Sequence, residues 1–527
     1  MFRTNGTDND ACGMVWPGQA DSRAKAKLML VIISDLHLTD GSSSETTSPG
    51  ALDIFARQLP GLAEAASWRT GGEYRPIDRI DLVLLGDTLD VIRSEQWSAS
   101  ACIRPWGNVE SPEFFEQISR ITGDILDNNE TSLALLRGLA DGGAIRIPPA
   151  LRVGRPAPEG DLQSVPVRVF SMVGNHDWFF HLSGPALDTL RREVVRRMGL
   201  CNRYDEPFPH DITENDELLR TMRRHKIMAR HGDLYDPLNF DGDRNTASLG
   251  DVIVIELINR FIAEIERQFA DDLPAATRLG LREIDNIRPT LLVPVWIDGL
   301  LERSCANPSL RKRVKTLWDR LVEEFLAIDF VRQRDTWSPL DTVDGLRQAL
   351  TFSRRLPVGW AGAVLAWLNK IRGSASDSYL SHAVAEQDFR NRRAKHIVYG
   401  HTHVAESVPL DASYAEGFVL NQVYFNAGTF RRVHRQTQLA AGEHEFIACD
   451  LMNYLVFYQG DERKGRPYET WSGTLGYNPA EVPVHRIDPG RKSHAQGQSV
   501  SAPNLHQRGP HFTVGATPAG SSDRHRI

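Results

Sequence analysis

Five short, mostly apolar runs, each followed at once by residues that can bind a metal or carry a proton, constrain this chain most. The runs are Leu28–Ile33, Ile80–Leu85, Val167–Val173, Lys226–Arg230 and His396–Tyr399. Their length and composition predict buried strands of an α/β sheet. In open α/β sheets the loops after the carboxyl ends of the strands converge while the strands stay rigid. We therefore expect the residues that follow the five runs to meet in one site.

These residues form five motifs with a restricted set of side chains. The motifs are Ser34-Asp35-Leu36-His37, Gly86-Asp87, Gly174-Asn175-His176-Asp177, His231-Gly232-Asp233 and Gly400-His401-Thr402-His403. They offer carboxylate, amide and imidazole donors but no thiolate. Such a mixed nitrogen and oxygen set suits Mn²⁺, Fe, Zn²⁺ or Co²⁺ better than Ca²⁺ or Cu(I). The motifs predict a site for two divalent metal ions.

The spacing within the motifs supports a dinuclear arrangement. Asp35 and His37 are two residues apart, as are His401 and His403, so on extended backbone each pair faces one side. Asp87 has two carboxylate oxygens and can bridge two cations. Two cations about 3.5–4 Å apart can hold a bridging hydroxide as nucleophile and stabilise the phosphoryl oxygens of an in-line displacement. The predicted reaction is hydrolysis of a phosphomonoester, phosphodiester or pyrophosphate.

In content and order the motifs resemble those of the calcineurin-like metallophosphoesterases. The matching series is Asp35-x-His37, Gly86-Asp87, Gly174-Asn175-His176-Asp177, His231 and Gly400-His401-x-His403. The resemblance covers roughly residues 27–240 and 394–460, and the stretch between His231 and His401 lies outside it. It implies an α/β fold of the two-sheet αββα sandwich type, with helices outside the sheets, interrupted here by a large helical insertion.

The resemblance also implies a role for each motif residue. One metal would be held by Asp35, His37, Asp87 and His403, and the other by Asp87, Asn175, His231 and His401. His176 would contact the phosphate and protonate the leaving oxygen, and Asp177 would orient His176 or its loop. Asp90 and Asp233 are candidate partners of the ligands. For Asp90, Asp177 and Asp233 the alternative is a structural role such as a helix cap.

The residues around the motifs favour some branches of the family over others. Protein Ser/Thr phosphatases would carry Gly-Asp-x-Val-Asp-Arg-Gly and Gly-Asn-His-Glu, unlike Gly86–Val91 and Asp177 here. The motifs are most similar to those of the UDP-2,3-diacylglucosamine pyrophosphatase branch, which usually has Arg in place of His176 and a shorter helical lid. Nucleases of double-strand-break repair share Gly-Asn-His-Asp. A nuclease or nucleotide phosphodiesterase, and a regulatory partner-binding scaffold, are the alternatives.

The charge and composition of the chain indicate which classes of substrate and partner to expect. The net charge of -7 gives no overall attraction to nucleic acid, so the expected substrate is a phosphorylated small molecule or a nucleotide-linked one. Arg230, Arg244, Arg431 and Arg432 flank the motifs and are candidates for holding a phosphate, with a solvated surface position as the alternative.

The five cysteines are scattered without Cys-x-x-Cys, which argues against a disulfide framework and a zinc knuckle. No signal peptide and no run of about 18 apolar residues is found, which predicts a cytoplasmic protein without a transmembrane segment.

Composition along the chain predicts five segments. They are a polar N-terminal segment (1–26), the first part of the core (27–240), a mainly helical insertion or cap (241–393), the second part of the core (394–484) and a disordered tail (485–527). In the insertion, apolar residues recur at helical spacing from Val254 to Phe269 and from Val314 to Ile328, and a shorter helix is expected at 359–372. Elsewhere we expect helices at 51–66, 113–139 and 185–198, and strands at Phe418–Phe425 and Glu445–Tyr458.

Overall fold

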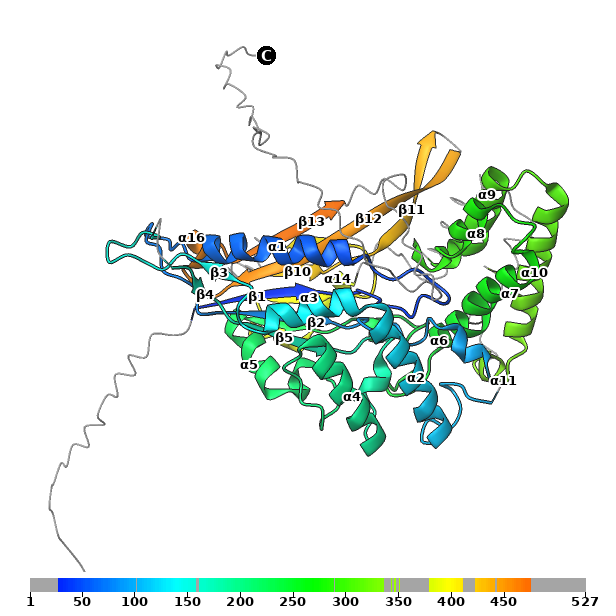
Figure 1. Cartoon of the computed structure of the whole chain (residues 1–527), viewed down its shortest axis with the longest axis horizontal. Coiled ribbons are helices and arrows are strands. Elements are labelled where there is room, and N and C mark those ends of the chain that lie inside the picture. The colour runs from blue at the N-terminus through cyan, green and yellow to red at the C-terminus, as the bar shows by residue number, and fades with distance from the viewer. Residues whose placement is uncertain are drawn as a thin grey trace, which may run out of the picture. The chain divides into compact units, whose positions relative to one another are not determined.

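The computed structural model describes residues 27–474, apart from 101, 158–160, 289, 411–421, 441–442 and most of 336–378. The N-terminal segment, the helix expected at 359–372 and the tail at 485–527 lie outside the described residues. The core and the helical insertion belong to the same compact unit (Figure 1).

A seven-stranded mixed sheet carries the first three motifs. Its order is β5-β2-β1-β12-β11-β7, with β13 also paired to β12. The parallel strands β1 (Leu28–Ile33), β2 (Arg79–Leu85) and β5 (Val167–Met172) were all expected from their apolar runs. Nearly all their side chains are buried on both faces of the sheet, as is typical of central parallel strands.

The long strand β12 (Glu443–Tyr458) connects these parallel strands to the rest of the sheet. Its first half pairs antiparallel with β11 (Arg432–Ala440), and its second half pairs with β1 and with β13 (Tyr468–Thr474). The insertion adds β7 (Ile287–Arg288), which lies parallel to β11. The sequence pattern predicted β12 but not β11, β13 or β7, because β11 and β13 are polar and β7 has only two residues.

A second, four-stranded sheet carries the last two motifs. It contains β6 (Ile227–Ala229), β8 (His396–Tyr399), β10 (Val423–Asn426) and β9 (Glu406–Pro409) in that order. The first three are parallel, and β9 is antiparallel to β10. Leu30, Ile32 and Val83 of the first sheet pack against Ala229, Val398 and Phe425 of the second. The two sheets therefore enclose one hydrophobic core between them.

Helices cover the other faces of both sheets. On the first sheet, Met29 and Val31 of β1 pack with apolar residues of four helices, which are α1 (Pro49–Ala66), α2 (Pro112–Asn128), α3 (Glu130–Ala140) and α4 (Pro185–Met198) (Figure 1). On the second sheet, α14 (Leu380–Ala385) and α15 (Gln387–Arg390) cover Ile397 and Tyr399. α5 (Asp216–His225) contributes Leu218 and Met222 to the core between the sheets. The expected mixed α/β class with layered sheets and helices is confirmed.

The helix expected at 113–139 is two helices that meet at Asn129. The Asn129 side chain donates hydrogen bonds to the carbonyls of Thr39 and Ile125, at 2.8 Å and 2.7 Å. The bond to Thr39 ties the chain to the loop after β1, and the bond to Ile125 caps the last turn of α2, so α2 ends here and α3 begins. Helical periodicity runs through both helices and does not reveal the break.

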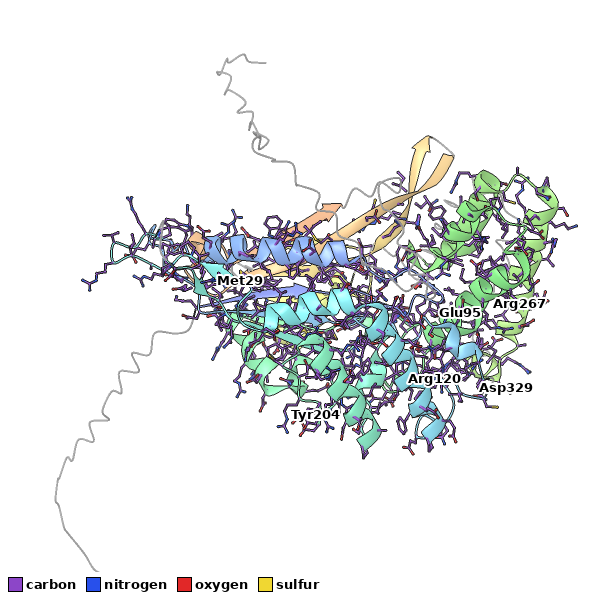
Figure 2. All side chains as sticks on the ribbon, viewed as in Figure 1. Met29, Glu95, Arg120, Tyr204, Arg267 and Asp329 are labelled. Carbon is purple, nitrogen blue, oxygen red and sulfur yellow. The ribbon has the colours of Figure 1, made fainter. Side chains whose placement is uncertain are left out.

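The described part of the insertion is mainly helical, as expected. It contains α6 (Leu249–Val252), the π-helix η5 (Ile253–Asn259), α7 (Arg260–Phe269), α8 (Ala275–Leu281), α9 (Val293–Ser304), α10 (Pro308–Leu326) and α11 (Asp329–Arg332). Charged residues such as Arg267 and Asp329 lie on its surface (Figure 2). No helix among the described residues is both long and apolar enough for a membrane span.

The amphipathic helix expected from Val254 to Phe269 is in fact η5 followed by α7. All seven residues of η5 are buried, including Glu256 and Asn259. Asn259 accepts a hydrogen bond from Arg93 at 2.8 Å and donates to the carbonyls of Ile92 and Ser94. These contacts attach η5 to the loop after β2. The predicted stripe is confirmed in α7, where Phe261, Ile262, Ile265 and Phe269 are buried, whereas η5 is buried all round.

The core between the sheets supplies a test of this packing. Leu30 is fully buried, and we expect Leu30→Ala to lower the free energy of unfolding by about 2–5 kcal/mol through lost burial and a cavity. Leu279→Ala is the matched control, since this side chain of α8 is 59% exposed, and it should change stability by less than about 0.5 kcal/mol. Urea unfolding followed by circular dichroism measures both. Equal effects would contradict the assignment of the inter-sheet core.

Candidate metal centre

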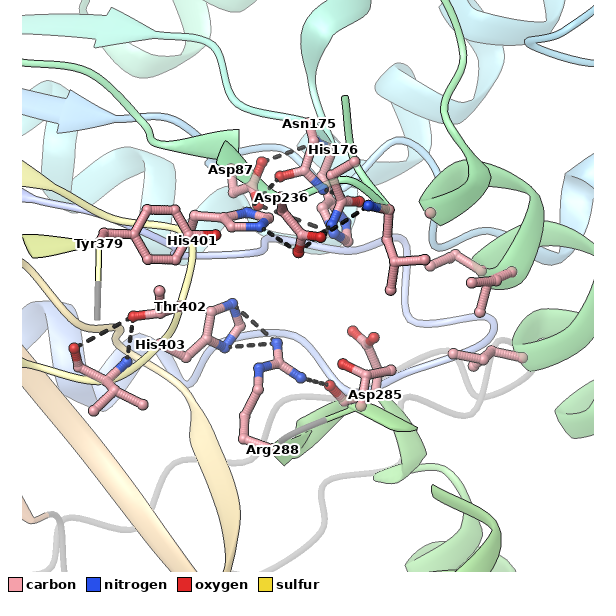
Figure 3. A pocket seen from close by; sticks show the side chains of 18 of the residues that line it. Asp87, Asn175, His176, Asp236, Asp285, Arg288, Tyr379, His401, Thr402 and His403 are labelled. Carbon is pink, nitrogen blue, oxygen red and sulfur yellow. Dashed lines mark hydrogen bonds and ion pairs between the residues drawn. The ribbon is translucent and has the colours of Figure 1, made fainter. Parts of the chain in front are cut away.

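The carboxyl ends of β1, β2, β5, β6 and β8 bring the predicted ligands together, as Figure 3 shows for several of them. In each of two groups the ligand atoms all lie within 4.8 Å of one another. One group is Asp35, His37 and His403, and the other is Asp87, His231 and His401. A third group joins His37 and Asp87 to His176, which sequence reasoning had placed outside the ligand set. The two main groups divide the residues as the motif resemblance divides them between two metals.

The first group consists of acceptors that point at one another. His37 Nδ1 lies 2.8 Å from Asp90 Oδ2, so its proton resides there and Nε2 has a free lone pair. The Nε2 atom of His37 lies 3.0 Å from the Nε2 atom of His403. The Nε2 atom of His403 in turn lies 3.3 Å from Asp35 Oδ1. Asp35 Oδ1 is buried and has no hydrogen-bond donor. Because buried acceptors without a donor are costly, this donor set fits a bound cation.

The second group has the same character. His231 Nδ1 lies 2.9 Å from the Leu85 carbonyl oxygen, so its Nε2 faces Asp87 Oδ2 and Asn175 Oδ1, each at 3.2 Å. Asn175 donates its amide hydrogen to Asn239, which leaves its oxygen turned to the histidines. His401 Nδ1 is 2.9 Å from the same oxygen, and its Nε2 is 3.2 Å from Asp236 Oδ2. These atoms fit a second cation.

Burial and the neighbouring charges decide how the site is protonated without metal. Burial lowers the pKa of His403, and the Arg288 charge lowers it further, so the ring is neutral and keeps its lone pair. Burial also opposes a charge on His231, but Asp87 outweighs it and raises the pKa of His231 to about 10. Burial works against ionisation of Asp87, yet His231 and His176 hold its pKa well below the usual range. In the second group a metal would therefore replace a proton on binding.

His176 lies beside the ligands, with its ring fixed by Asp90. His176 Nδ1 is 2.6 Å from Asp90 Oδ1, while the other oxygen of Asp90 holds His37. Burial opposes a charge on His176, but Asp90 and Asp87 raise its pKa to about 10. Asp90 thus orients one candidate ligand and one candidate proton donor with a single carboxylate, which agrees with the role expected of a ligand partner.

Asp177 contacts the loop rather than the ring of His176. Its carboxylate accepts backbone hydrogen bonds from Gly174 at 2.7 Å and from Thr88 at 2.8 Å. It therefore joins the loop after β5 to the loop after β2. Burial and the nearby charge of Asp87 raise the pKa of Asp177 to about 7. Of the two roles expected for it, the geometry supports orientation of the loop.

Five of the predicted ligands have backbone in the left-handed region. The φ angles are 57° at Asp35, 46° at His37, 50° at Asp87, 68° at His401 and 59° at His403. Only nine non-glycine residues of the described chain have positive φ. Each such residue costs roughly 1–2 kcal/mol, and strain of this kind gathers at functional sites. The clustering of strain at the ligands supports their assignment to a site.

The glycines of the motifs are required by close approach. A Cβ atom on Gly174 would lie 2.7 Å from His231 Nε2 and in contact with Asp87 Oδ1. A Cβ on Gly400 would lie 2.7 Å from Asp35 Oδ2. At these two positions a side chain would displace the ligands themselves, so the backbone of one motif packs directly on the ligands of another.

The four arginines expected to flank the site are paired with carboxylates. Arg244 forms two bonds to Asp233, and Arg230 pairs with Asp211 and Glu386. Arg432 pairs with Glu283 and Asp450, and Arg431 lies 3.4 Å from Asp285. None of the four lines the cavity beside the ligands. Asp233 is thus held by an arginine, and in this loop the carboxylate in contact with a candidate ligand is Asp236.

A cavity of about 540 Å³ opens beside the two groups, and the insertion forms much of its wall (Figure 3). Asp87, Asn175, His176, His401 and His403 line it from the core. The insertion contributes Ile253, Val254, Ile258, Asp285, Arg288, Thr290 and Tyr379. The sequence did not point to Arg288 or Asp285, because neither residue belongs to a motif. No sequence signal distinguishes Arg288 from the other 60 lysines and arginines of the chain.

Comparison with known proteins adds no assignment to this geometry. No family model matches the chain, and neither a curated protein nor a solved structure is significantly similar to it.

The close packing at Gly174 can be tested directly. Gly174→Ala should lower metal content and destabilise the protein by about 1–3 kcal/mol, because the new methyl group displaces Asp87 and His231. The control is Gly138→Ala in α3, where nothing lies within 4 Å of the new atom. It should keep full metal content and gain up to about 1 kcal/mol from helix propensity. Elemental analysis after dialysis, with thermal unfolding, measures both, and equal metal content in the two variants would contradict the geometry.

Proposed function

We propose that this protein is a dinuclear metal-dependent hydrolase of the metallophosphoesterase type, which cleaves a phosphoester or pyrophosphate bond. The observation that carries the proposal is the position of Asp87 between the two ligand groups. Its Oδ2 atom lies 3.2 Å from His231 Nε2 and 3.7 Å from His37 Nε2. One carboxylate oxygen thus faces ligands of both groups, as a bridging ligand must. The layered α/β fold and the order of the motifs support the same family.

Each residue of the site has a part in this reaction. Asp35, His37, Asp87 and His403 would hold one divalent cation, and Asp87, Asn175, His231 and His401 the other, with Mn²⁺, Fe, Zn²⁺ or Co²⁺ as candidates. When bound, the two cations would supply Lewis acidity to the phosphoryl group and activate a water nucleophile.

His176 is the proposed proton donor. Its Nδ1 atom is engaged by Asp90, and the ring lines the cavity, so Nε2 is the atom available to a substrate. In the metal-free site burial opposes a charge on this ring, but Asp90 and Asp87 outweigh it and raise the pKa of His176 to about 10. A protonated imidazole held at a fixed angle can deliver its proton to the leaving oxygen as the ester bond breaks.

The size and the walls of the cavity support a small phosphorylated substrate. A volume of about 540 Å³ falls in the range of small-molecule sites. Residues of η5 and β7 in the insertion line this cavity, so the insertion contributes to the binding space. The complete ligand set supports an enzyme over a regulatory scaffold, because a scaffold has no need of strained ligand backbone.

The shared carboxylate gives the first test. Asp87→Asn should lose metal and reduce hydrolysis of p-nitrophenyl esters by more than about 100-fold, since even outer-shell changes cost about 10–100-fold. Asp81→Asn is the control, because Asp81 is an equally buried carboxylate at the other end of β2, paired with Arg79 and Arg168. It should be less stable but keep its metals. The panel should include mono- and bis-p-nitrophenyl phosphate, a nucleotide pyrophosphate and single-stranded DNA. A wild-type protein that binds no divalent metal and cleaves none of these would refute the proposal.

The proton donor gives the second test. His176→Ala should retain both metals yet lose rate by on the order of 10²–10⁴-fold, as for removal of a general acid. His181→Ala is the control, since His181 lies five residues on, bonds the Phe208 carbonyl and does not line the cavity. Metal content and kcat for p-nitrophenyl phosphate measure both. Loss of metal from His176→Ala would make it a ligand, in line with the third group of atoms, rather than the acid.

A further inference from the structure

Arg288 reaches the candidate site from the insertion, outside every motif. It ends β7, where it is the register partner of Arg435 on β11. Its guanidinium group lines the cavity, with Nη2 at 2.9 Å from His403 Nδ1 and 3.1 Å from His403 Nε2 (Figure 3). Nη1 donates to the backbone carbonyls of Asp285 and Ile287. The charged group is therefore in direct contact with a candidate ligand.

The pairing of Arg288 differs from that of five other arginines near the site. Arg93, Arg230, Arg244, Arg431 and Arg432 each form an ion pair with at least one carboxylate. Within the described part of the chain, no carboxylate forms an ion pair with Arg288. Burial lowers its pKa and the nearby Asp285 raises it, but a guanidinium stays charged in proteins. A half-buried charge that has no carboxylate in direct contact and faces a cavity is suited to an anionic ligand.

The segment that carries Arg288 is fixed to the core at three points. Glu283 pairs with Arg432 and also contacts His434. Asp285 is buried between Arg93 and Arg431, at 3.7 Å and 3.4 Å. Ile287 is fully buried, and β7 adds the backbone pairing with β11. Arg288 is thus positioned by a rigid extension of the core, which is what a binding residue requires.

We propose that Arg288 is a phosphate-binding residue, which holds the phosphoryl oxygens of the substrate and favours a doubly charged phosphomonoester over a singly charged diester. The proposal rests on the proposed function, because it places the phosphoryl group beside the ligands. A cation held by His403 would repel the guanidinium from its present contact, and the open space next to it is the cavity. There its planar donors match phosphoryl oxygens.

The preference for a monoester follows from Coulomb's law. The attraction of one positive charge is twice as large for a dianion as for a monoanion at the same distance. Inside a cavity with a low effective dielectric constant this difference is larger than in water. Loss of the Arg288 charge should therefore weaken recognition of the monoester more than that of the diester.

The experiment compares Arg288→Gln and Arg288→Lys with Arg278→Gln. Arg278 is an insertion residue that pairs with Glu266 away from the cavity. Inorganic phosphate is titrated calorimetrically into each protein, metal-loaded and metal-free, and kcat/KM is measured for p-nitrophenyl phosphate and bis-p-nitrophenyl phosphate. Thermal unfolding and metal content verify that each variant is folded and loaded. Arg288→Lys keeps the positive charge but loses the planar pair of hydrogen-bond donors. If Arg288→Gln does not fold, the comparison is made with Arg288→Lys.

We expect Arg288→Gln to weaken phosphate binding by on the order of 10–100-fold, as for loss of a charge-assisted hydrogen bond. The ratio of monoester to diester kcat/KM should fall, Arg288→Lys should recover part of both losses, and Arg278→Gln should match the wild type. Phosphate affinity unchanged in Arg288→Gln, or equal losses for the two esters, would overturn the proposal. Failure of the proposed function would look different, because then the wild type itself would bind no metal and hydrolyse neither ester.

Discussion

The buried carboxylate of Asp87 is the contact on which the rest of the candidate site depends. One of its oxygens accepts the backbone hydrogen of His176, and the other faces the imidazoles of both ligand groups. The glycines before and opposite it leave no room for a side chain, and His231 is held against it by the Leu85 carbonyl. Both sheets thus meet at this carboxylate, since β2 lies in one and β6 in the other. A charge so buried is tolerable only where cations or protonated rings surround it.

The strands that carry the motifs, and the convergence of the motifs at one edge, could be predicted from sequence. β1 is an unbroken apolar run, and the geometry of parallel strands then dictates where Asp35 and His37 lie. Other features had no such signal. β11 and β13 are polar strands that exist because β12 is long enough to pair with both. Asp90 accepts hydrogen bonds from His37 and His176, whereas Asp177 accepts them from backbone groups. The spacing of residues in the sequence does not predict these contacts.

The insertion is better understood as a wall of the site than as a separate cap. Buried polar contacts join it to the loop after β2, through Asn259 with Arg93 and Glu256 with Arg104. Asp285 adds a buried charge between two core arginines. Such contacts are costly to break one at a time, so the insertion and the core should act as one cooperative unit. If the proposed function holds, discrimination among phosphate esters can reside in residues of the insertion that belong to no motif, such as Arg288.

The left-handed backbone at five candidate ligands has a consequence for how this chain persists over generations. Glycine or asparagine would adopt those φ angles more readily than histidine, so replacements that abolish the centre would relieve strain and could raise stability. Drift under selection for folding alone would therefore erode the ligands first, because proteins are held only just above the stability they need. At these five positions the stability of the fold and the geometry of the candidate metal centre therefore make opposite demands on the choice of residue.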